Sequence, residues 1–119
     1  MSEVTLVEAV QMALNKAMEM DEKVIVLGQD VGPDGGVFRA TDGLHEKFGT
    51  DRVFDTPLAE AMIAGHAVGM AIQGFRPVAE IQFMGFIYPT IDQMLNHAAR
   101  FRNRTRGRFT CPMVLRAPF

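Results

Sequence analysis

The stretch DTPLAEAMIAGHAVGMAIQG, residues 55–74, decides the fold of this chain. A rigid Thr56-Pro57 turn leads into a long apolar run, which predicts a buried helix over about 59–73 that ends at Gly74. One carboxylate, Glu60, lies at the start of this run. A glutamate in so apolar a setting is costly to ionise unless something pairs with it, and it suits acid–base work on a bound heterocycle. From the segment alone, the favoured interpretation is that Glu60 only favours the dipole of the first helical turn, because acids are common there.

Three small residues, Ala61, Gly65 and Gly69, share one face of this predicted helix. Glycine inside a helix costs roughly 1 kcal/mol relative to alanine, so two glycines indicate that another backbone approaches closely. That backbone belongs either to a strand of the same domain or to a helix of a partner subunit, and the sequence leaves both open.

Working outward from this helix, apolar runs and helical patterns alternate along the whole chain. Strands are predicted over 24–27, 52–55, 76–83 and 113–115, and further helices over 5–20, 41–47 and 90–102. The first of these strands is apolar throughout, which is typical of a central strand of a parallel sheet. The alternation predicts an α/β fold, a parallel sheet flanked by helices, in one domain over residues 1–119.

Capping signals and side-chain spacing refine three of these helices. Thr5 and Glu8 predict a capping box at the start of the first helix, and Thr41 is predicted to cap the short one. The apolar side chains of the first helix are predicted to form one inward face, made of Leu6, Val10, Ala13, Leu14, Ala17 and Met18. The last helix is predicted to face inward through Ile91, Met94, Leu95, Ala98 and Phe101.

Composition and charge limit the classes of function. Hydrophobic residues make up 48% of the chain and charged residues 22%, which is typical of a globular domain. The net charge of −2 gives no bulk attraction to nucleic acid or anionic membranes, and no apolar run reaches the ~18 residues that span a bilayer. The acidic start Met1-Ser2-Glu3 has neither a secretory nor a transit pattern. These features predict a bacterial cytoplasmic protein, with the mitochondrial matrix as the weaker alternative.

Several other residues are of types that often form sites. The glycine-rich segment 28–36 lacks the spacing of a phosphate-binding loop, so a plain connecting loop is favoured over a phosphate cradle. The histidines are far apart and have no metal-ligand spacing, so surface or packing roles are predicted for His45, His66 and His97. The single cysteine, Cys111, excludes an internal disulfide and is predicted to be a buried structural thiol.

Five arginines lie within residues 100–108, flanked by Phe101 and Phe109. Such a run could grip phosphates or RNA, with the aromatic rings as stacking surfaces. The favoured alternative is a helix C-terminus followed by a solvated or partner-facing loop, because no basic face elsewhere extends the run. No nucleic-acid partner is therefore predicted.

Six segments together resemble one family: VLGQDVG (26–32), GGVF (35–38), DTPLAEA (55–61), GFRPVAEIQF (74–83), DQ (92–93) and PMVLRAP (112–118). They resemble the N-terminal part of the beta subunit of thiamine-diphosphate-dependent 2-oxoacid dehydrogenases, most closely the pyruvate type. The resemblance covers essentially the whole chain. It implies a pyrimidine-binding domain of the transketolase type that is incomplete at its C-terminus, with the C-terminal transketolase domain absent.

The resemblance also implies roles for individual residues. Glu60 matches the catalytic glutamate that hydrogen-bonds a ring nitrogen of the cofactor's aminopyrimidine and favours its imino form. Phe86 matches an aromatic residue that packs on the pyrimidine ring, with Leu58 and Gln82 in the same wall. Met113 matches a position whose main-chain carbonyl can help to hold potassium. Gln29 stands where the family usually has a second glutamate of the cofactor site, and an amide cannot exchange protons as a carboxylate does.

The implied activity is the oxidative decarboxylation of pyruvate, the product of glycolysis, with transfer of the acyl group to the lipoyl group of a transacetylase. The implied partners are an alpha subunit that holds the diphosphate and its magnesium, a second beta subunit in a heterotetramer, and the transacetylase core. The isolated chain is then expected to be inactive. Branched-chain 2-oxoacid or acetoin dehydrogenase is the alternative of the same class, and a non-catalytic assembly module is the alternative of another class.

Overall fold

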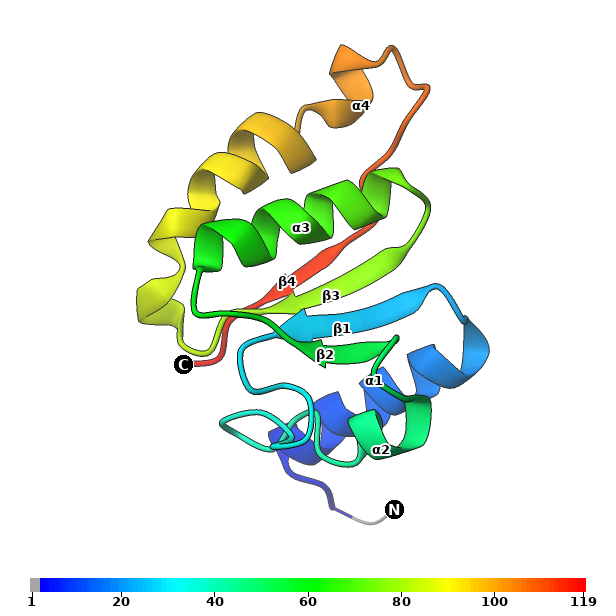
Figure 1. Ribbon diagram of the computed structural model, residues 1–119, viewed down its shortest axis with the longest axis vertical. Coiled ribbons are helices and arrows are strands. Elements are labelled where there is room, and N and C mark those ends of the chain that lie inside the picture. The colour runs from blue at the N-terminus through cyan, green and yellow to red at the C-terminus, as the bar shows by residue number, and fades with distance from the viewer. Residues whose placement is uncertain (1–2) are drawn as a thin grey trace.

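The computed structural model describes residues 3–119 and contains a four-stranded, wholly parallel sheet in the order β2-β1-β3-β4 (Figure 1). The strands are β1 (Val24–Gly28), β2 (Val53–Asp55), β3 (Arg76–Glu80) and β4 (Val114–Arg116). Met1 and Ser2, where the sequence predicted no leader, lie outside the described residues. The predicted α/β fold with a parallel sheet is confirmed.

Helices cover both faces of this sheet (Figure 1). One face carries α1 (Leu6–Met20) and α2 (Leu44–Phe48), and the other carries α3 (Glu60–Ile72). The strand β1 is buried along its whole length, as predicted for a central strand. Alternate residues of β1 therefore enter different cores: Val24 and Val26 pack with α1 and α2, whereas Leu27 packs with α3.

The helix α1 begins with the predicted capping box. Thr5 N donates to Glu8 Oε2 at 2.7 Å, and Glu8 N donates to Thr5 Oγ1 at 3.3 Å. Of the predicted inward face, Leu14 and Met18 are buried and Val10 packs against the same core. The prediction was wrong for three members, since Leu6 is 82% exposed and the other two, Ala13 and Ala17, are exposed as well. Leu6 borders an open groove with Phe38, Pro118 and Phe119 rather than the sheet, and Ala17 borders the open groove between α1 and β4.

The helix α2 begins later than predicted. Its N-cap is Gly43, whose φ of 74° lies in the left-handed region. Thr41 does not cap the helix, because its buried hydroxyl donates to the Val31 carbonyl at 2.8 Å. The helix ends at Phe48, one residue beyond the predicted range, with Gly49 as its C-cap.

The predicted third strand and last helix differ most from the structure. The strand β3 ends at Glu80 rather than Phe83. The chain then forms two 3₁₀ turns (Met84–Phe86 and Tyr88–Thr90), a π-helical segment (Gln93–Ala98) and the short α4 (Phe101–Arg104) instead of one helix. The wider π turn breaks the 3.6-residue period on which the inward face was predicted. Ile91 and Leu95 are accordingly exposed, while Met94, Ala98 and Phe101 are half-buried.

The small-residue face of α3 does not receive a backbone within the described chain. A Cβ on Gly65 would lie 3.2 Å from Oε1 of Gln93, so a side chain of the π-helical segment occupies that space. Within residues 3–119, nothing lies within 4 Å of a Cβ built on Gly69, and Ala61 is exposed. No strand within residues 3–119 occupies this face, so a strand from outside this range and a helix of a partner subunit both stay predictions.

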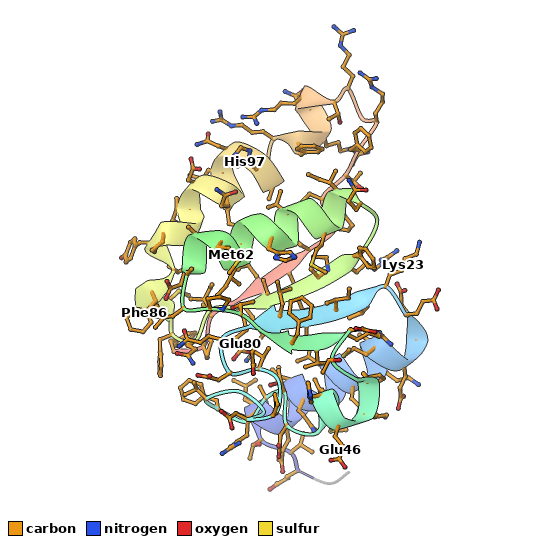
Figure 2. All side chains as sticks on the ribbon, in the orientation of Figure 1. Lys23, Glu46, Met62, Glu80, Phe86 and His97 are labelled. Carbon is orange, nitrogen blue, oxygen red and sulfur yellow. The ribbon has the colours of Figure 1, made fainter. Side chains whose placement is uncertain are left out.

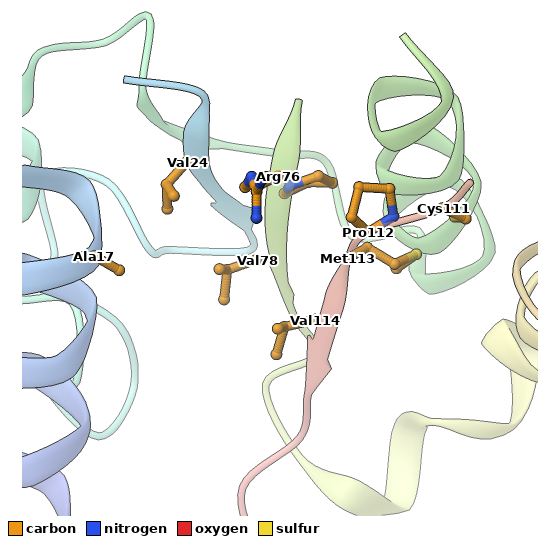
Figure 3. Close-up of a pocket in the computed structure, with 9 residues that line it drawn as sticks. Ala17, Val24, Arg76, Val78, Cys111, Pro112, Met113 and Val114 are labelled. Carbon is orange, nitrogen blue, oxygen red and sulfur yellow. The ribbon is translucent and has the colours of Figure 1, made fainter. Parts of the chain in front are cut away.

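The face of the sheet that carries α1 is only partly covered. Figure 3 shows Val24, Val78 and Val114, from β1, β3 and β4, pointing to the same side, with Ala17 of α1 at one border. The first two valines are buried, whereas Val114 is exposed, and the space between α1 and β4 is a groove of about 330 Å³. No helix within residues 3–119 has the length and apolarity needed to cross a membrane.

Candidate ligand site at the carboxyl edge of the sheet

The four parallel strands end at one edge of the sheet, where Gly28, Asp55, Glu80 and Arg116 are aligned by the strand register. In open α/β sheets, ligands bind just beyond the carboxyl ends of the strands. The helix α3 begins at this edge, and it packs against the 3₁₀ turn Tyr88–Thr90 (Figure 1). Most of the predicted site residues therefore lie in segments at this carboxyl edge.

Glu60 is the first residue of α3 and is half-buried. Its helix has Ala59 at the N-cap, with no side-chain hydrogen bond there. Among residues 3–119, no hydrogen bond or ion pair engages the Glu60 carboxylate. Two flanking apolar side chains are exposed, Leu58 at 71% and Met62 at 37%. The carboxylate is therefore free to bind a group from outside the described chain, at a surface that is apolar but open.

Three aromatic rings line the same edge: Phe38, Phe83 and Phe86. The Phe83 ring meets the Phe86 ring edge to face, with centroids 5.9 Å apart, and meets Phe38 similarly at 5.6 Å. Phe86 is 53% exposed and lies at the margin of the molecule (Figure 2). An exposed ring held by its neighbours offers a stacking face to a flat heterocycle. Phe38 and Phe83 were not predicted as neighbours of Phe86, although both lie in segments that carry the family resemblance.

Gln82 follows β3 and reaches back to the loop after β1. Its Nε2 donates to Oδ2 of Asp30 at 2.6 Å, and both side chains are half-buried. Gln29 is also half-buried and immediately precedes Asp30, so it lies at the same edge. Both glutamines were predicted as site residues, whereas Asp30 was not.

A buried ion pair supports this edge from below. Glu80 is only 2% exposed, and its Oε2 accepts a hydrogen bond from Nη1 of Arg116, its register partner on β4. Burial lowers the pKa of the Arg116 guanidinium. Two main-chain bonds continue the link beyond the strands, from Ile81 N to Arg116 O and from Met84 N to Pro118 O, both at 2.9 Å. The sequence signal for the pair was a lone acid in an apolar strand, which needs a partner when buried.

Three main-chain amides of the glycine-rich loop donate hydrogen bonds within the protein. Gly32 N donates to Asp55 Oδ1 at 2.7 Å, Gly35 N to Gly32 O at 3.0 Å, and Gly36 N to Asp30 O at 2.8 Å. A phosphate cradle needs such amides free. The structure therefore favours the connecting-loop interpretation. Gly28 itself is required for close approach, because a Cβ there would lie 2.6 Å from the Glu80 carbonyl oxygen.

Met113 lies apart from the other predicted site residues. It directly precedes β4, at the amino end of the sheet, and lines the groove of Figure 3 with Cys111. Its side chain packs against the core beneath α3. The structure brings Glu60, Leu58, Gln82, Phe86 and Gln29 to one edge but does not bring Met113 there. Within residues 3–119, no group of three or more histidine, cysteine or acidic side chains could hold a metal.

The remaining candidates are dispersed. His45 Nδ1 lies 2.8 Å from the Val53 carbonyl oxygen, and the ring of His66 lies 6.2 Å from that of Phe54, in keeping with packing roles. Cys111 is half-buried, and burial raises the pKa of its thiol, as expected of a structural cysteine. The arginines of 100–108 are exposed on α4 and the following turn, at the far end of the molecule from the carboxyl edge (Figure 1).

Comparisons with known proteins agree with this architecture. Residues 2–119 match the family described as the transketolase, pyrimidine binding domain. Because this match spans nearly the whole chain, the protein belongs to that family. The predicted pyrimidine-binding fold is thereby confirmed.

Several curated relatives of this chain are beta subunits of dehydrogenases. The chain is 58% identical over 118 residues to the pyruvate dehydrogenase E1 component subunit beta of Acholeplasma laidlawii, covering 99% of this chain and 36% of that one. It is 52% identical to the subunit of the same name from Bacillus subtilis, covering 100% and 37%. It is also 55% identical over 114 residues to the 3-methyl-2-oxobutanoate dehydrogenase subunit beta of Mycobacterium tuberculosis, covering 96% and 33%.

The resemblance to beta subunits of 2-oxoacid dehydrogenases is thus confirmed. The chain spans about a third of the length of these curated relatives. Relatives named for pyruvate and relatives named for branched-chain 2-oxoacids have similar identities, so the comparisons do not separate these substrates.

Proposed function

We propose that this chain is the pyrimidine-binding part of a beta subunit that acts with thiamine diphosphate in the oxidative decarboxylation of pyruvate. The observation that carries the proposal is Glu60, a half-buried carboxylate without a partner in residues 3–119, at the carboxyl edge of a domain of this family. A first-turn acid that only favoured the helix dipole would not need the exposed aromatic ring of Phe86 at the same edge.

The residues at this edge fit an aminopyrimidine. Such a ring presents a flat face, a basic ring nitrogen and an exocyclic amino group. The carboxyl group of Glu60 suits the ring nitrogen, the side-chain carbonyl of Gln82 suits the amino group, and the exposed Phe86 ring suits the flat face. The diphosphate finds no comparable site here, because the amides of Gly32, Gly35 and Gly36 already donate to other protein oxygens. The arginine run lies at the far end of the molecule. We therefore assign the diphosphate and its magnesium to an alpha subunit.

The cofactor supplies, when bound, an electron sink for loss of carbon dioxide from a 2-oxoacid. Glu60 holds a proton at the ring nitrogen, and Gln82 accepts a hydrogen bond from the amino group. Phe86 and Leu58 exclude water from the face of the ring. Gln29 can orient a neighbouring group but cannot relay a proton, because an amide does not titrate at neutral pH. A potassium ion at the Met113 carbonyl remains a separate proposal.

The open carboxyl edge also supports a shared site. Large apolar side chains at this edge are exposed, Tyr88 among them at 78%. Exposed apolar area of this kind marks protein–protein contacts. We assign these contacts to the alpha subunit, with a second beta subunit and a lipoyl transacetylase as further partners of the assembled enzyme. A bacterial cytoplasmic location remains a prediction.

The test is Glu60→Gln in the full-length beta subunit, assembled with its alpha subunit. Loss of a positioned proton-transfer group lowers rates by 10²–10⁴-fold, so a decrease of about 100-fold or more in decarboxylation is expected with assembly intact. Glu46→Gln is the matched control, since Glu46 is an exposed acid on α2, across the sheet from α3. Near-normal turnover of the Glu60 variant would remove the role proposed for this residue.

A second substrate class is supported by the relatives themselves, because 2-oxoisovalerate dehydrogenase subunit beta of Bacillus subtilis is 50% identical over 119 residues. The ratio of kcat/KM for pyruvate to that for 3-methyl-2-oxobutanoate decides between the two, with acetoin as a third substrate in the same assay. If the chain is only an assembly module, an enzyme assembled with it turns over none of the three substrates.

A further inference from the structure

The geometry points to Asp30 as a positioning residue that fixes the orientation of the Gln82 amide, so that the amide carbonyl faces an amino group of the ligand. This inference rests on the proposed function and deepens it. It assigns a role to a carboxylate that lies 52 positions before its partner in the sequence.

The hydrogen bond between the two side chains has only one possible polarity. Gln82 Nε2 lies 2.6 Å from Asp30 Oδ2. An ionised carboxylate accepts hydrogen bonds but cannot donate them, whereas a side-chain amide has one donor end and one acceptor end. The amide nitrogen must therefore point toward Asp30, which removes the usual ambiguity about which way a glutamine amide points.

Asp30 is itself held in place by the loop. Its φ of 57° lies in the left-handed region, where aspartate is one of the few non-glycine residues that are tolerated. Its carbonyl accepts a hydrogen bond from Gly36 N at 2.8 Å. The start of the loop is anchored as well, since Thr56 N donates to Gly28 O at 2.9 Å. The carboxylate is thus presented from a constrained backbone.

Because the amide nitrogen points toward Asp30, the amide oxygen of Gln82 points away from it. Among residues 3–119, Nε2 to Asp30 is the one side-chain hydrogen bond of Gln82, so Oε1 is left to accept from outside the described chain. The side chain is half-buried at the carboxyl edge. A ligand amino group, such as that of an aminopyrimidine, can donate to Oε1. A reversed amide would instead set two donors against each other and weaken binding.

The test compares two probes, thiamine diphosphate and its analogue in which hydrogen replaces the exocyclic amino group. The variant is Asp30→Asn in the full-length beta subunit assembled with its alpha subunit, because asparagine keeps the size but can also donate, which lets the Gln82 amide reverse. Dissociation constants are measured by calorimetry without a 2-oxoacid present. We expect about 10-fold weaker binding of thiamine diphosphate and less than a twofold change for the analogue, as for one lost hydrogen bond.

Two further variants complete the design. Asp34→Asn is the matched control, an exposed acid in the same loop, and should change neither constant. In a Gln82→Ala background, Asp30→Asn should have no further effect, because Asp30 acts only through Gln82. Equal weakening of both probes, no weakening, or an undiminished effect in the Gln82→Ala background would overturn the role of Asp30 while leaving the proposed function intact. Failure of the parent enzyme to bind thiamine diphosphate would overturn both.

Discussion

At the amino end of the sheet, the Arg52 guanidinium donates hydrogen bonds to the carbonyls of Met18, Asp21 and Val24, at 2.8–3.1 Å. At the carboxyl end, the Glu60 carboxylate and the Gln82 carbonyl have no partner within residues 3–119. Folded proteins satisfy nearly all their buried polar groups. Glu60 and Gln82 are half-buried rather than buried, so their open atoms remain accessible to a ligand or subunit at the carboxyl end.

The amino end also joins its segments internally. The Asp21 carboxylate accepts from Lys23 N at 2.8 Å and pairs with Arg76 Nε at 3.0 Å, so it ties the end of α1 to the start of β3. Below the carboxyl end, the corresponding tie is the Glu80–Arg116 pair, which is buried rather than exposed. The comparison predicts different outcomes when charges at the two ends are removed.

The largest effect on stability is expected from Arg116→Met. This change leaves the buried Glu80 carboxylate without its cation, and removing one member of a buried pair destabilises by roughly 3–5 kcal/mol. Urea unfolding of the chain measures the difference, with Arg108→Met as the control because Arg108 is exposed. An Arg116 variant as stable as the parent would mean that the pair adds nothing to the carboxyl edge.

A smaller loss is expected from Arg52→Met at the amino end. The change leaves three main-chain carbonyls without a shared donor, and hydrogen bonds to a charged group contribute about 1.5–3 kcal/mol each at most. Because these carbonyls are partly reached by water, we expect about 2 kcal/mol in urea unfolding and no change in the affinity for thiamine diphosphate. A loss of affinity would show that the two ends are coupled.

Glu60→Gln is expected to leave the free energy of unfolding within about 0.5 kcal/mol of the parent, since the carboxylate has no partner in residues 3–119. The same urea experiment measures it. A decrease in the free energy of unfolding above about 1 kcal/mol would show that Glu60 stabilises the fold, and the two ends would then not differ in this respect.

The smallest expected effect concerns Cys111, near the amino end of β4. Burial raises the pKa of its thiol, and a raised pKa leaves less reactive thiolate at each pH. Alkylation by iodoacetamide, followed by mass spectrometry, should therefore be slower at pH 8 than for a free cysteine, with its midpoint at higher pH. A midpoint at or below that of free cysteine would contradict burial of this thiol.

The sequence predicted well those features that depend on neighbouring residues. The capping box of Thr5 and Glu8, the fully buried β1 and the helix α3 all follow from local spacing. From these elements alone the parallel α/β fold could be predicted. The edge at which the candidate site lies could also be predicted, because parallel strands share one carboxyl edge.

The features that were missed depend on contacts between distant segments. The Glu80–Arg116 pair requires the register of β3 with β4, and the Asp30–Gln82 bond requires that of β1 with β3. Threonine is a common helix N-cap, but the Thr41 hydroxyl donates its hydrogen bond to the Val31 carbonyl instead. The π-helical segment Gln93–Ala98 has an apolar pattern that an ordinary helix would share, so its exposed Leu95 could not be foreseen.

The Glu80–Arg116 pair joins residues 36 positions apart, and this separation has a consequence during synthesis. Ribosomes extend chains at about 5–20 residues per second, so the arginine emerges roughly two to seven seconds after its acidic partner. Until then the Glu80 carboxylate on β3 has no cation to pair with. Burying it between the neighbouring strands is therefore unfavourable. Pairing of β3 with its charge partner thus waits until β4 has left the exit tunnel.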